Sequence, residues 1–312
     1  RGKEDTLMKT IKLGGVLPAS EIALGCMRIS ALSPREAEVL VRTALENGID
    51  FFDHADIYGG GASEEVFAKA AGMCPRVRES MLLQTKCGIV PGKAYDFSKK
   101  HILESVEGSL RRLNTEYVDV LLLHRPDTLM EPEEVAEAFD ELHRTGKVRY
   151  FGVSNQNPFQ MELLSRSLHQ KLLINQLQFG PAHTGMIDAG LHVNMKDAPS
   201  LVHDGGILEY CRLRDVTIQP WSPFQYGFFE GVFLGSDKFP ELNAVIRELA
   251  EEKGVPDAAV ATAWILRHPA RMQPIAGTTK TARLVDICKA SGVELTREEW
   301  YRLYLAAGNN LP

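Results

Sequence analysis

Four side chains with complementary acid–base chemistry follow three successive apolar runs of the chain. Asp53 and Tyr58 come after residues 49–52, Lys86 ends the second run, and His124 ends the third. A phenol has an unperturbed pKa of about 10, and a neighbouring ammonium lowers that value. At about 4 Å and an effective dielectric constant near 20, one ammonium supplies on the order of the 4 kcal/mol that a pKa near neutrality requires. We therefore expect Lys86 to lower the pKa of Tyr58.

Asp53 and His124 complete the chemistry that this group can perform. The carboxylate of Asp53 would keep the ammonium of Lys86 charged and in place, and His124 would orient a carbonyl oxygen or join a proton relay. Such a set can protonate a developing alkoxide while hydride reaches the neighbouring carbon. Because no side chain provides hydride, a cofactor must supply it. The four residues therefore indicate a carbonyl reductase.

The elements that must position these residues form a repeating pattern. Apolar runs end in polar or aromatic residues, and a helix-like segment follows most of them; the runs are 49–52, 81–85, 118–123, 149–153, 172–174, 216–220 and 272–276. Strand, polar end and helix in repetition are typical of an α/β fold, the (β/α)8 TIM barrel, whose active site lies at the carboxyl ends of the strands. Residues 22–27 would be the first strand.

Several further elements are predicted around this barrel. Residues 9–13 and 16–18, joined by Gly14-Gly15, should form an N-terminal β-hairpin that closes the amino end of the barrel. Helices are expected over 98–113, over 131–145 and after Ser33, where Ser33 is the N-cap, Pro34 the first helical residue and Glu36 the partner in a capping box.

The size and composition of the chain favour one domain over residues 1–312. Its residues are 44% hydrophobic and 24% charged, without a linker or charge block. The net charge of −6 argues against nucleic-acid binding and against a basic membrane patch. No apolar run approaches the ~20 residues of a membrane span, and the start is no signal peptide. Five scattered cysteines without a C-x-x-C pair predict reduced thiols and a cytoplasmic location.

Residues at the remaining strand ends could form a cofactor-binding site. A Rossmann site is not expected because the chain contains no G-x-G-x-x-G. Amide and hydroxyl groups after two strands can hold a carboxamide, and an indole after a third can cover a nicotinamide ring. Cations and N–H groups at the start of the last barrel helix favour a phosphate. In chain order these residues are Ser154, Asn155, Gln176, Trp221, Thr278, Lys280 and Arg283.

The same segments resemble the aldo-keto reductase superfamily. Residues 52–59, followed by Glu64-Glu65, resemble its D-x-A-x-x-Y-G segment. Further family segments match in the right order, at Gln84-Thr85-Lys86, 123–127, 146–149, 152–155, Asn175-Gln176 and Trp221-Ser222-Pro223. The matches extend from about Leu24 to Asp286, and in detail they are similar to a bacterial branch of predicted oxidoreductases.

The resemblance implies an enzyme that reduces an aldehyde or ketone with NADPH, by pro-R hydride transfer. Tyr58 would be the general acid, tuned by Lys86 and Asp53, while His124 orients the substrate. Cofactor contacts are implied at Cys26, Met27, Asp53, Ser222, Pro223, Gly277, Thr278 and Asp286, with Trp221 stacked on the nicotinamide. Many members have a lysine in place of Gly277, against the 2′-phosphate. Because that lysine is absent here, Lys280 and Arg283 remain for this role, and NADH remains possible as the cofactor.

Two other classes of function remain open. A cofactor-sensing regulatory subunit of the same fold would bind NADPH with little turnover of any carbonyl. A barrel hydrolase or isomerase that depends on metal or phosphate is disfavoured, because no cluster of histidines and carboxylates follows the strands. The histidines at 183, 192 and 203 have spacings that suit no standard zinc site, so no metal is expected. Nothing indicates a protein partner.

Structural roles also remain open for single residues. Asp53 and Lys86 could form an ion pair inside the barrel, and His124 and Trp221 could belong to its core. Residues 154–155 could be the N-cap region of a helix that Pro158 opens. Lys280 and Arg283 could belong to a solvated helix face.

Two segments interrupt the alternation of strands and helices, and we expect them to form loops over the barrel mouth. Residues 183–206 are long and polar, and residues 225–239 are aromatic and glycine-rich. Loops of this length in a compact domain are usually functional or disordered. Aromatic residues near the second segment favour a substrate that is partly aromatic or apolar; they are Trp221, Phe224, Tyr226, Phe228 and Phe229.

Overall fold

The computed structural model describes residues 8–312, and its centre is a barrel of eight parallel strands. The strands are β3 (Ala23–Gly25), β4 (Phe51–Asp53), β5 (Leu82–Cys87), β8 (Val118–Leu123), β9 (Val148–Ser154), β10 (Leu172–Gln178), β11 (Thr217–Trp221) and β14 (Ile275–Ala276). Their order in the sheet is β11-β10-β9-β8-β5-β4-β3-β14. The two ends of this order are joined, because the N–H of Gln273 donates to the carbonyl of Ile218 over 3.1 Å. The predicted TIM barrel is confirmed.

The predicted hairpin lies under the amino end of the barrel. It consists of β1 (Thr10–Leu13) and β2 (Leu17–Ser20), and the φ angles of Gly14 and Gly15 are 57° and 77°. The N–H of Gly14 donates to Thr217 Oγ1 over 2.9 Å. A buried cluster joins the hairpin to residues inside the barrel; it contains Ile11, Leu13, Leu17, Ala19, Ala23, Phe51, Val120, Leu122, Leu173, Ile174 and Ile275. The hairpin thus closes one end, and the site must open at the other.

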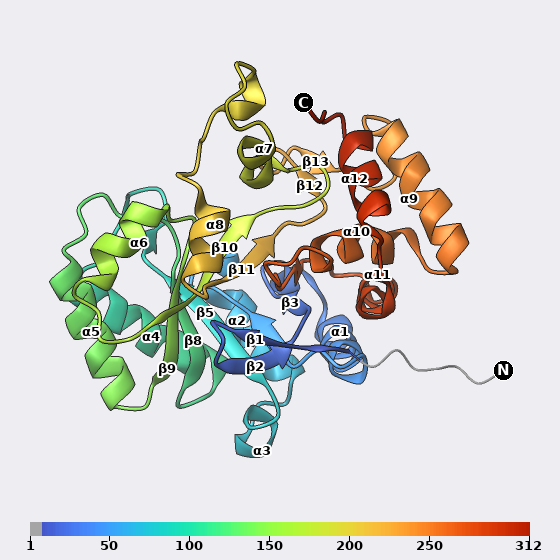
Figure 1. Cartoon of the computed structure of the whole chain (residues 1–312). Helices are drawn as coiled ribbons and strands as arrows, with labels where there is room; N and C mark the ends of the chain where they lie inside the picture. The colour runs from blue at the N-terminus through green and yellow to red at the C-terminus, as the bar shows by residue number, and fades with distance from the viewer. Residues whose placement is uncertain (1–7) are drawn as a thin grey trace.

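Most barrel strands are followed by a helix on the outside of the barrel, as Figure 1 shows. These helices are α1 (Pro34–Glu46), α2 (Ala62–Ala70), α4 (Lys99–Leu113), α5 (Pro132–Arg144), α6 (Pro158–Ser165), α8 (Ile207–Leu213), α10 (Asp257–Leu266) and α11 (Thr281–Cys288). The short α3 (Pro75–Arg78) precedes β5. Two further helices, α9 (Pro240–Lys253) and α12 (Arg297–Ala306), pack against each other beside α10.

The helix starts show that local sequence signals were reliable. Ser33 Oγ accepts from the N–H of Glu36, and Glu36 Oε2 accepts from the N–H of Ser33 over 2.8 Å, so the predicted capping box is present. Ser98 likewise caps α4 by accepting from the N–H of His101. The helix expected over 131–145 is α5, with Glu131 at its N-cap position.

The two segments expected as loops contain regular structure. Residues 183–206 include α7 (Gly185–Leu191) and the 3-10 turn η3 (Ala198–Ser200), and they protrude above the barrel in Figure 1. Residues 225–239 contain a hairpin of β12 (Gln225–Tyr226) and β13 (Gly231–Val232). A third hairpin, β6 (Ile89–Val90) and β7 (Ala94–Tyr95), follows β5. We predicted loops over the barrel mouth in the first two of these segments and made no prediction of their conformation, so these short elements are new from the structure.

Over residues 8–312, no helix is both long and apolar enough to cross a membrane. Within the same residues, no group of three or more histidine, cysteine, aspartate or glutamate side chains is placed to hold a metal ion. All five cysteines are free thiols, and only Cys74 is exposed.

Candidate active site

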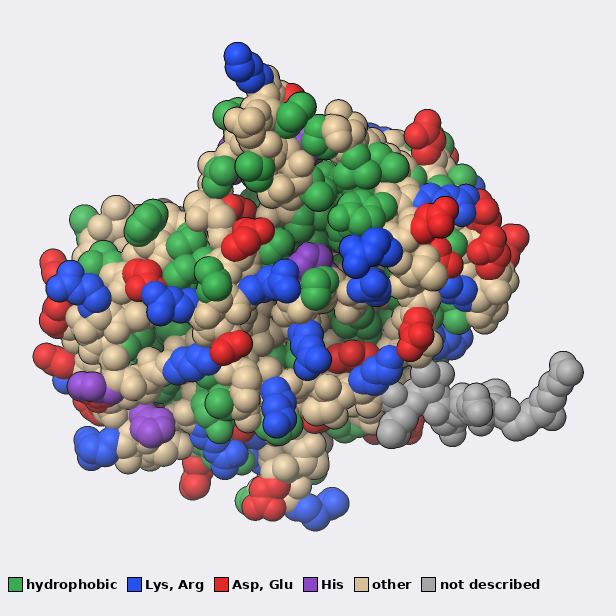
Figure 2. Space-filling view, in the orientation of Figure 1, with side chains coloured by type: hydrophobic (Ala, Val, Ile, Leu, Met, Phe, Trp, Pro, Cys, Tyr) green, Lys and Arg blue, Asp and Glu red, His purple; other side chains and the backbone are tan. Residues whose placement is uncertain are grey.

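A cavity of about 650 Å³ opens at the carboxyl ends of the barrel strands. Most of the residues selected from the sequence line it: Met27, Asp53, Tyr58, His124, Ser154, Asn155, Gln176, Trp221, Ser222, Pro223, Gly277, Thr278 and Arg283. Figure 2 shows hydrophobic side chains gathered around a hollow beside the protruding segment, with lysine and arginine side chains near its edge. The fold therefore brings together residues that are more than 200 positions apart in sequence.

A glycine-rich turn after β4 places Tyr58 at the wall of this cavity. The pairing of β4 with β5 continues beyond the strand, because the N–H of Asp56 donates to the carbonyl of Lys86 over 3.0 Å. Tyr58 then begins the 3-10 turn η2 (Tyr58–Gly61), in which Gly59 has a φ of 58°. A Cβ on Gly59 would lie 2.5 Å from Ser30 Oγ, so the turn requires glycine for space as well as for conformation. This turn directs the phenol back over the strand ends.

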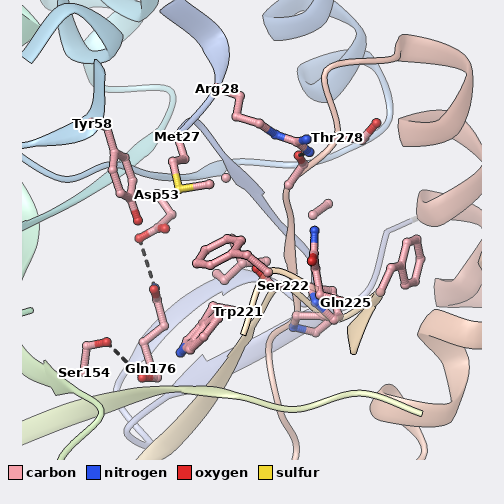
Figure 3. A pocket seen from close by; sticks show the side chains of 18 of the residues that line it. Met27, Arg28, Asp53, Tyr58, Ser154, Gln176, Trp221, Ser222, Gln225 and Thr278 are labelled. Carbon is pink, nitrogen blue, oxygen red and sulfur yellow. Dashed lines mark hydrogen bonds between the residues drawn. The ribbon is translucent and has the colours of Figure 1, made fainter. Parts of the chain in front are cut away.

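Lys86 is fully buried, and its ammonium links Asp53 to Tyr58. Its Nζ donates to Asp53 Oδ2 over 2.8 Å, to the carbonyl of His54 over 2.8 Å and to Tyr58 Oη over 3.0 Å. An ammonium has three hydrogens, so all of them are engaged. Since Tyr58 Oη accepts one of them, its own hydrogen is left to point elsewhere. Figure 3 shows Tyr58 and Asp53 side by side at one end of the cavity.

The predicted pKa of Tyr58 requires a correction. Burial raises the pKa of the phenol above its ordinary value, Lys86 opposes this effect, and the charge of Asp53 adds to it. The expected fall towards neutrality was wrong because it left out burial, which is the largest cause of the raised pKa. Burial alone would lower the pKa of Lys86, but Asp53 and Tyr58 raise it above its ordinary value. At neutral pH the group thus combines a charged ammonium with a protonated phenol, which is the form of a proton donor.

His124 stands opposite Tyr58 and is held neutral by its surroundings. The two rings meet edge to face with their centroids 6.0 Å apart. Burial lowers the pKa of His124 well below its ordinary value, and the charges of Lys86 and Arg125 lower it further. Its Nδ1 is buried with no hydrogen-bond partner among residues 8–312. A neutral imidazole carries one N–H, and the ring lies at the cavity wall where that N–H can orient a carbonyl oxygen.

Buried glutamines hold Asp53 in place, and sequence reasoning did not select most of them. Gln84 and Gln176 both donate to Asp53 Oδ1, over 2.6 and 3.1 Å. Both also donate to Gln219 Oε1, over 2.8 and 3.0 Å. Gln219 in turn donates to Gln273 over 2.8 Å, and the chain of hydrogen bonds ends at a backbone carbonyl of β2. The orientation of the Asp53 carboxylate is therefore coupled to the hairpin at the far end of the barrel.

Trp221 is fixed at the middle of the cavity by the residue after β9. Its indole Nε1 donates to Asn155 Oδ1 over 3.0 Å, and Asn155 Nδ2 donates to Ser154 Oγ over 2.8 Å. Asn155 has a φ of 56°, a left-handed conformation that asparagine tolerates better than most residues. Figure 3 shows Trp221 next to Gln176. Residues 154–155 do not cap α6, because its N-cap is Asn157.

The other end of the cavity is cationic. Thr278 and Arg283 line it at the start of α11, as predicted. Arg28 also lines it and was not predicted; its guanidinium donates to the carbonyl of Gly277. Figure 3 shows Arg28 reaching towards Thr278. A loop arginine without a motif gives no signal in a single sequence, so only the structure reveals it.

Three predicted cofactor residues do not line the cavity. Cys26 is buried in the hydrophobic core, where burial raises its pKa well above the ordinary value. Lys280 is exposed at the N-cap position of α11. Asp286 pairs with Lys289 over 3.2 Å on the exposed face of the same helix. Lys86 is also absent from the lining, since it lies behind Tyr58 and donates to its hydroxyl.

Comparison with known proteins agrees with this geometry. A family model described as the Aldo/keto reductase family matches residues 21–305. The chain belongs to the aldo-keto reductase family. The match spans all eight strands of the barrel and the residues that line the cavity.

Individual members of the aldo-keto reductase family resemble the whole chain. The oxidoreductase YcsN of Bacillus subtilis is 37% identical, over 98% of this chain and 100% of its own length. The 6-dehydroglucose reductase of Agrobacterium fabrum is 34% identical, over 96% of this chain and 98% of its own. A solved aldo-keto reductase from Klebsiella pneumoniae in complex with NADPH has a TM-score of 0.76 at 24% identity, covering 95% of this chain and 94% of its own, a likeness in fold. As a member of the aldo-keto reductase family, the chain is an oxidoreductase.

Proposed function

We propose that this aldo-keto reductase reduces an aldehyde or ketone to an alcohol with NADPH, with Tyr58 as the proton donor. The observation that carries the proposal is the set of three hydrogen bonds made by Lys86 Nζ. They fix Tyr58 Oη as an acceptor towards Lys86, so the phenol hydrogen is available to a carbonyl oxygen in the cavity. The N–H of His124 holds the same oxygen from the other side. As the oxygen gains negative charge, both donors stabilise it more strongly.

The chemistry of the cavity wall suits a nicotinamide dinucleotide. When bound, NADPH supplies the hydride that reduces the carbonyl carbon. Gln176 has both hydrogens of its amide nitrogen engaged, which leaves its amide oxygen for a carboxamide. Trp221 presents an anchored aromatic face at the middle of the cavity. The remaining proposed contacts are Met27, Asp53, Ser154, Asn155, Ser222, Pro223, Gly277, Thr278 and Arg283.

We expect NADPH to bind better than NADH. Arg28 and Arg283 both line the end of the cavity that contains Thr278. A guanidinium can donate two parallel hydrogen bonds to the oxygens of a phosphate group. Lys280 is exposed nearby, at the N-cap position of α11, and can add charge without lining the cavity. Cys26 and Asp286 are placed less well for cofactor contacts than the sequence pattern implied. We also place the enzyme in the cytoplasm, in keeping with its five free thiols.

Fluorescence titration with NADPH and with NADH tests the cofactor claim. Trp221 is the tryptophan that lines the cavity, whereas Trp264 and Trp300 stack on each other in the core. We expect saturable quenching by NADPH, weaker binding of NADH, and loss of most of the signal in Trp221→Phe. Arg283→Ala should weaken NADPH more than NADH. Absence of binding by either nucleotide to the folded protein would remove the hydride source and overturn the proposal. Tight binding without turnover of any carbonyl would favour the regulatory role.

A further inference from the structure

Arg125 follows directly on His124, at the carboxyl end of β8, and is not used by the proposed mechanism. Its side chain is half-buried and lines the cavity. Among residues 8–312 no carboxylate lies within ion-pair distance of its guanidinium, and none of its N–H groups has a protein acceptor there. The neighbouring Asp127 does not serve it, since its carboxylate accepts from the N–H groups of Phe97 and Leu129. A guanidinium without an acceptor at the cavity wall is available to a ligand.

Two aromatic rings support this guanidinium from the side. Its Cζ lies 5.8 Å from the ring centroid of Trp221 and 5.8 Å from that of Phe228. The two rings are almost perpendicular to each other, at 89°. Cation–π contacts orient an arginine without neutralising its charge. Arg125 is therefore held in place while its N–H groups stay free to bind an anion.

Arg125 differs in position from the other charged residues of the cavity wall. The charged residues of the lining are three arginines and one aspartate, Asp53. Lys86 already compensates Asp53, so the wall carries net positive charge. Arg28 reaches Gly277 and Arg283 lies on α11, both at the cofactor phosphate end. Arg125 instead adjoins His124, at the end where the carbonyl is reduced.

We propose that Arg125 selects carbonyl substrates that carry a carboxylate group. The inference rests on the proposed reductase function and names the substrate class of the same site. A guanidinium and a carboxylate form two parallel N–H···O bonds, and such charge-assisted pairs are stronger than neutral hydrogen bonds. The surrounding wall is apolar and aromatic, contributed by residues such as Ile57, Trp221, Phe228 and Val232. The favoured substrate thus has an apolar or aromatic body with an aldehyde or ketone at one end and a carboxylate at the other.

The test compares two aldehydes of similar shape, 4-carboxybenzaldehyde, which carries a carboxylate, and methyl 4-formylbenzoate, in which a neutral methyl ester replaces it. For the wild-type enzyme, we expect kcat/KM to favour the carboxylate by about tenfold or more, as a hydrogen-bonded charge pair implies. Arg125→Gln should bring the ratio of the two values close to one, mainly by raising KM for the carboxylate. Arg125→Lys keeps the charge but loses the fork, so it should retain part of the preference. Arg247→Gln on α9 makes the same charge change on an exposed helix face and should keep the wild-type ratio.

Two results would overturn the inference. One is an equal kcat/KM for both aldehydes in the wild-type enzyme, and the other is a ratio that Arg125→Gln leaves unchanged. Calorimetric binding of the two aldehydes separates this inference from the reductase proposal. Carboxylate-dependent binding that is lost in Arg125→Gln would sustain the inference even if neither aldehyde were reduced. Failure of NADPH to reduce any aldehyde would count against the reductase proposal alone.

Discussion

Once Lys86 donates to Tyr58 Oη, the hydrogen of the phenol can only be directed towards another acceptor. The ammonium is tolerated in the barrel because Asp53 and the carbonyl of His54 accept its other hydrogens. A buried charge that loses its partner is strongly destabilising. Asp53 therefore supports both the stability of the barrel and the geometry of the donor. Variants at Asp53 or Lys86 would mix these effects, whereas the phenol can be changed with less disturbance.

At the residue scale, Tyr58→Phe isolates the proton donor. We expect the variant to fold normally and to lose about 10²–10⁴-fold in reduction rate, the usual contribution of a general acid. Its affinity for NADPH should stay close to the wild-type value, because the hydroxyl is directed to the substrate. Single-turnover rates and fluorescence titration of the same preparation check both points. Near-normal turnover in Tyr58→Phe would show that another group donates the proton.

Residue types predicted that the four proposed catalytic residues lie together, but they did not predict the residues that hold them in place. Asp53, Tyr58, Lys86 and His124 were found because acid–base residues directly after strands must meet at one edge of a barrel. Gln219 and Gln273 lie within apolar runs, and no spacing rule distinguishes an inward-facing glutamine from an outward-facing one. Only the register of neighbouring strands shows that these amides meet.

At the scale of elements, the turn between β4 and α2 contains a half-buried carboxylate, that of Asp56, which opposes folding. Burial raises the pKa of Asp56 to about 7, and the charge of Glu64 adds to this effect. One carboxylate oxygen of Asp56 has no hydrogen-bond partner among residues 8–312. Glu64 itself is paired, with Arg112 at 2.7 Å and Thr85 at 2.7 Å. Glu64 therefore neutralises most of the positive charge of Arg112, the cation next to Asp56.

Asp56→Asn should stabilise the protein, and more so at alkaline pH. The folded-state pKa of Asp56 lies above its unfolded value, so the carboxyl favours folding only at low pH and loses that effect as pH rises from about 4 to about 7. An interval of about 3 units corresponds to roughly 4 kcal/mol at about 1.4 kcal/mol per unit, as an upper bound. Urea unfolding at pH 5 and pH 8 would measure the gain, with Asp237→Asn as an exposed control. An equal effect at both pH values would contradict a raised pKa.

Local sequence signals predicted the helices around the barrel better than the short elements in the segments above its mouth. Capping residues such as Ser33 and Ser98 define helix starts within one turn, so α1 and α4 began where expected. The elements within 183–206 and 225–239 carry no comparable signal. α7 has seven residues and a buried Ile187, and its position depends on Tyr304 of α12, whose hydroxyl donates to Asp188 over 2.7 Å. A contact across 116 positions cannot be read from local sequence.

At the scale of the whole molecule, His192 connects the segment after β10 to the end of the chain. Its Nδ1 lies 2.7 Å from Asp197 Oδ2, and its Nε2 lies 3.1 Å from the carbonyl of Asn310. Both partners can only accept, so both ring nitrogens must carry hydrogen. The hydrogen bond to Asp197 is accordingly the main cause that raises the pKa of His192. The connection therefore requires the imidazolium form.

This connection should weaken as pH rises. Because the folded-state pKa of His192 is raised, its stabilising effect is complete below the ordinary value of 6.5 and is lost as pH rises through the folded-state value. Hydrogen exchange, corrected for intrinsic rates, should show less protection of residues 185–200 at pH 9 than at pH 6. In His192→Gln this difference should largely disappear. Equal protection at both pH values in the wild-type protein would show that the imidazolium is not required.

The claim that this barrel transfers hydride to a carbonyl is tested most directly by isotopic labelling. The enzyme would be incubated with 4-carboxybenzaldehyde and NADPH deuterated at the pro-R or the pro-S position of C4, and the alcohol analysed by mass spectrometry. The account predicts one deuterium in the alcohol from the pro-R label and none from the pro-S label. An alcohol without deuterium from either label, or no alcohol from any aldehyde offered to the cofactor-bound enzyme, would contradict it.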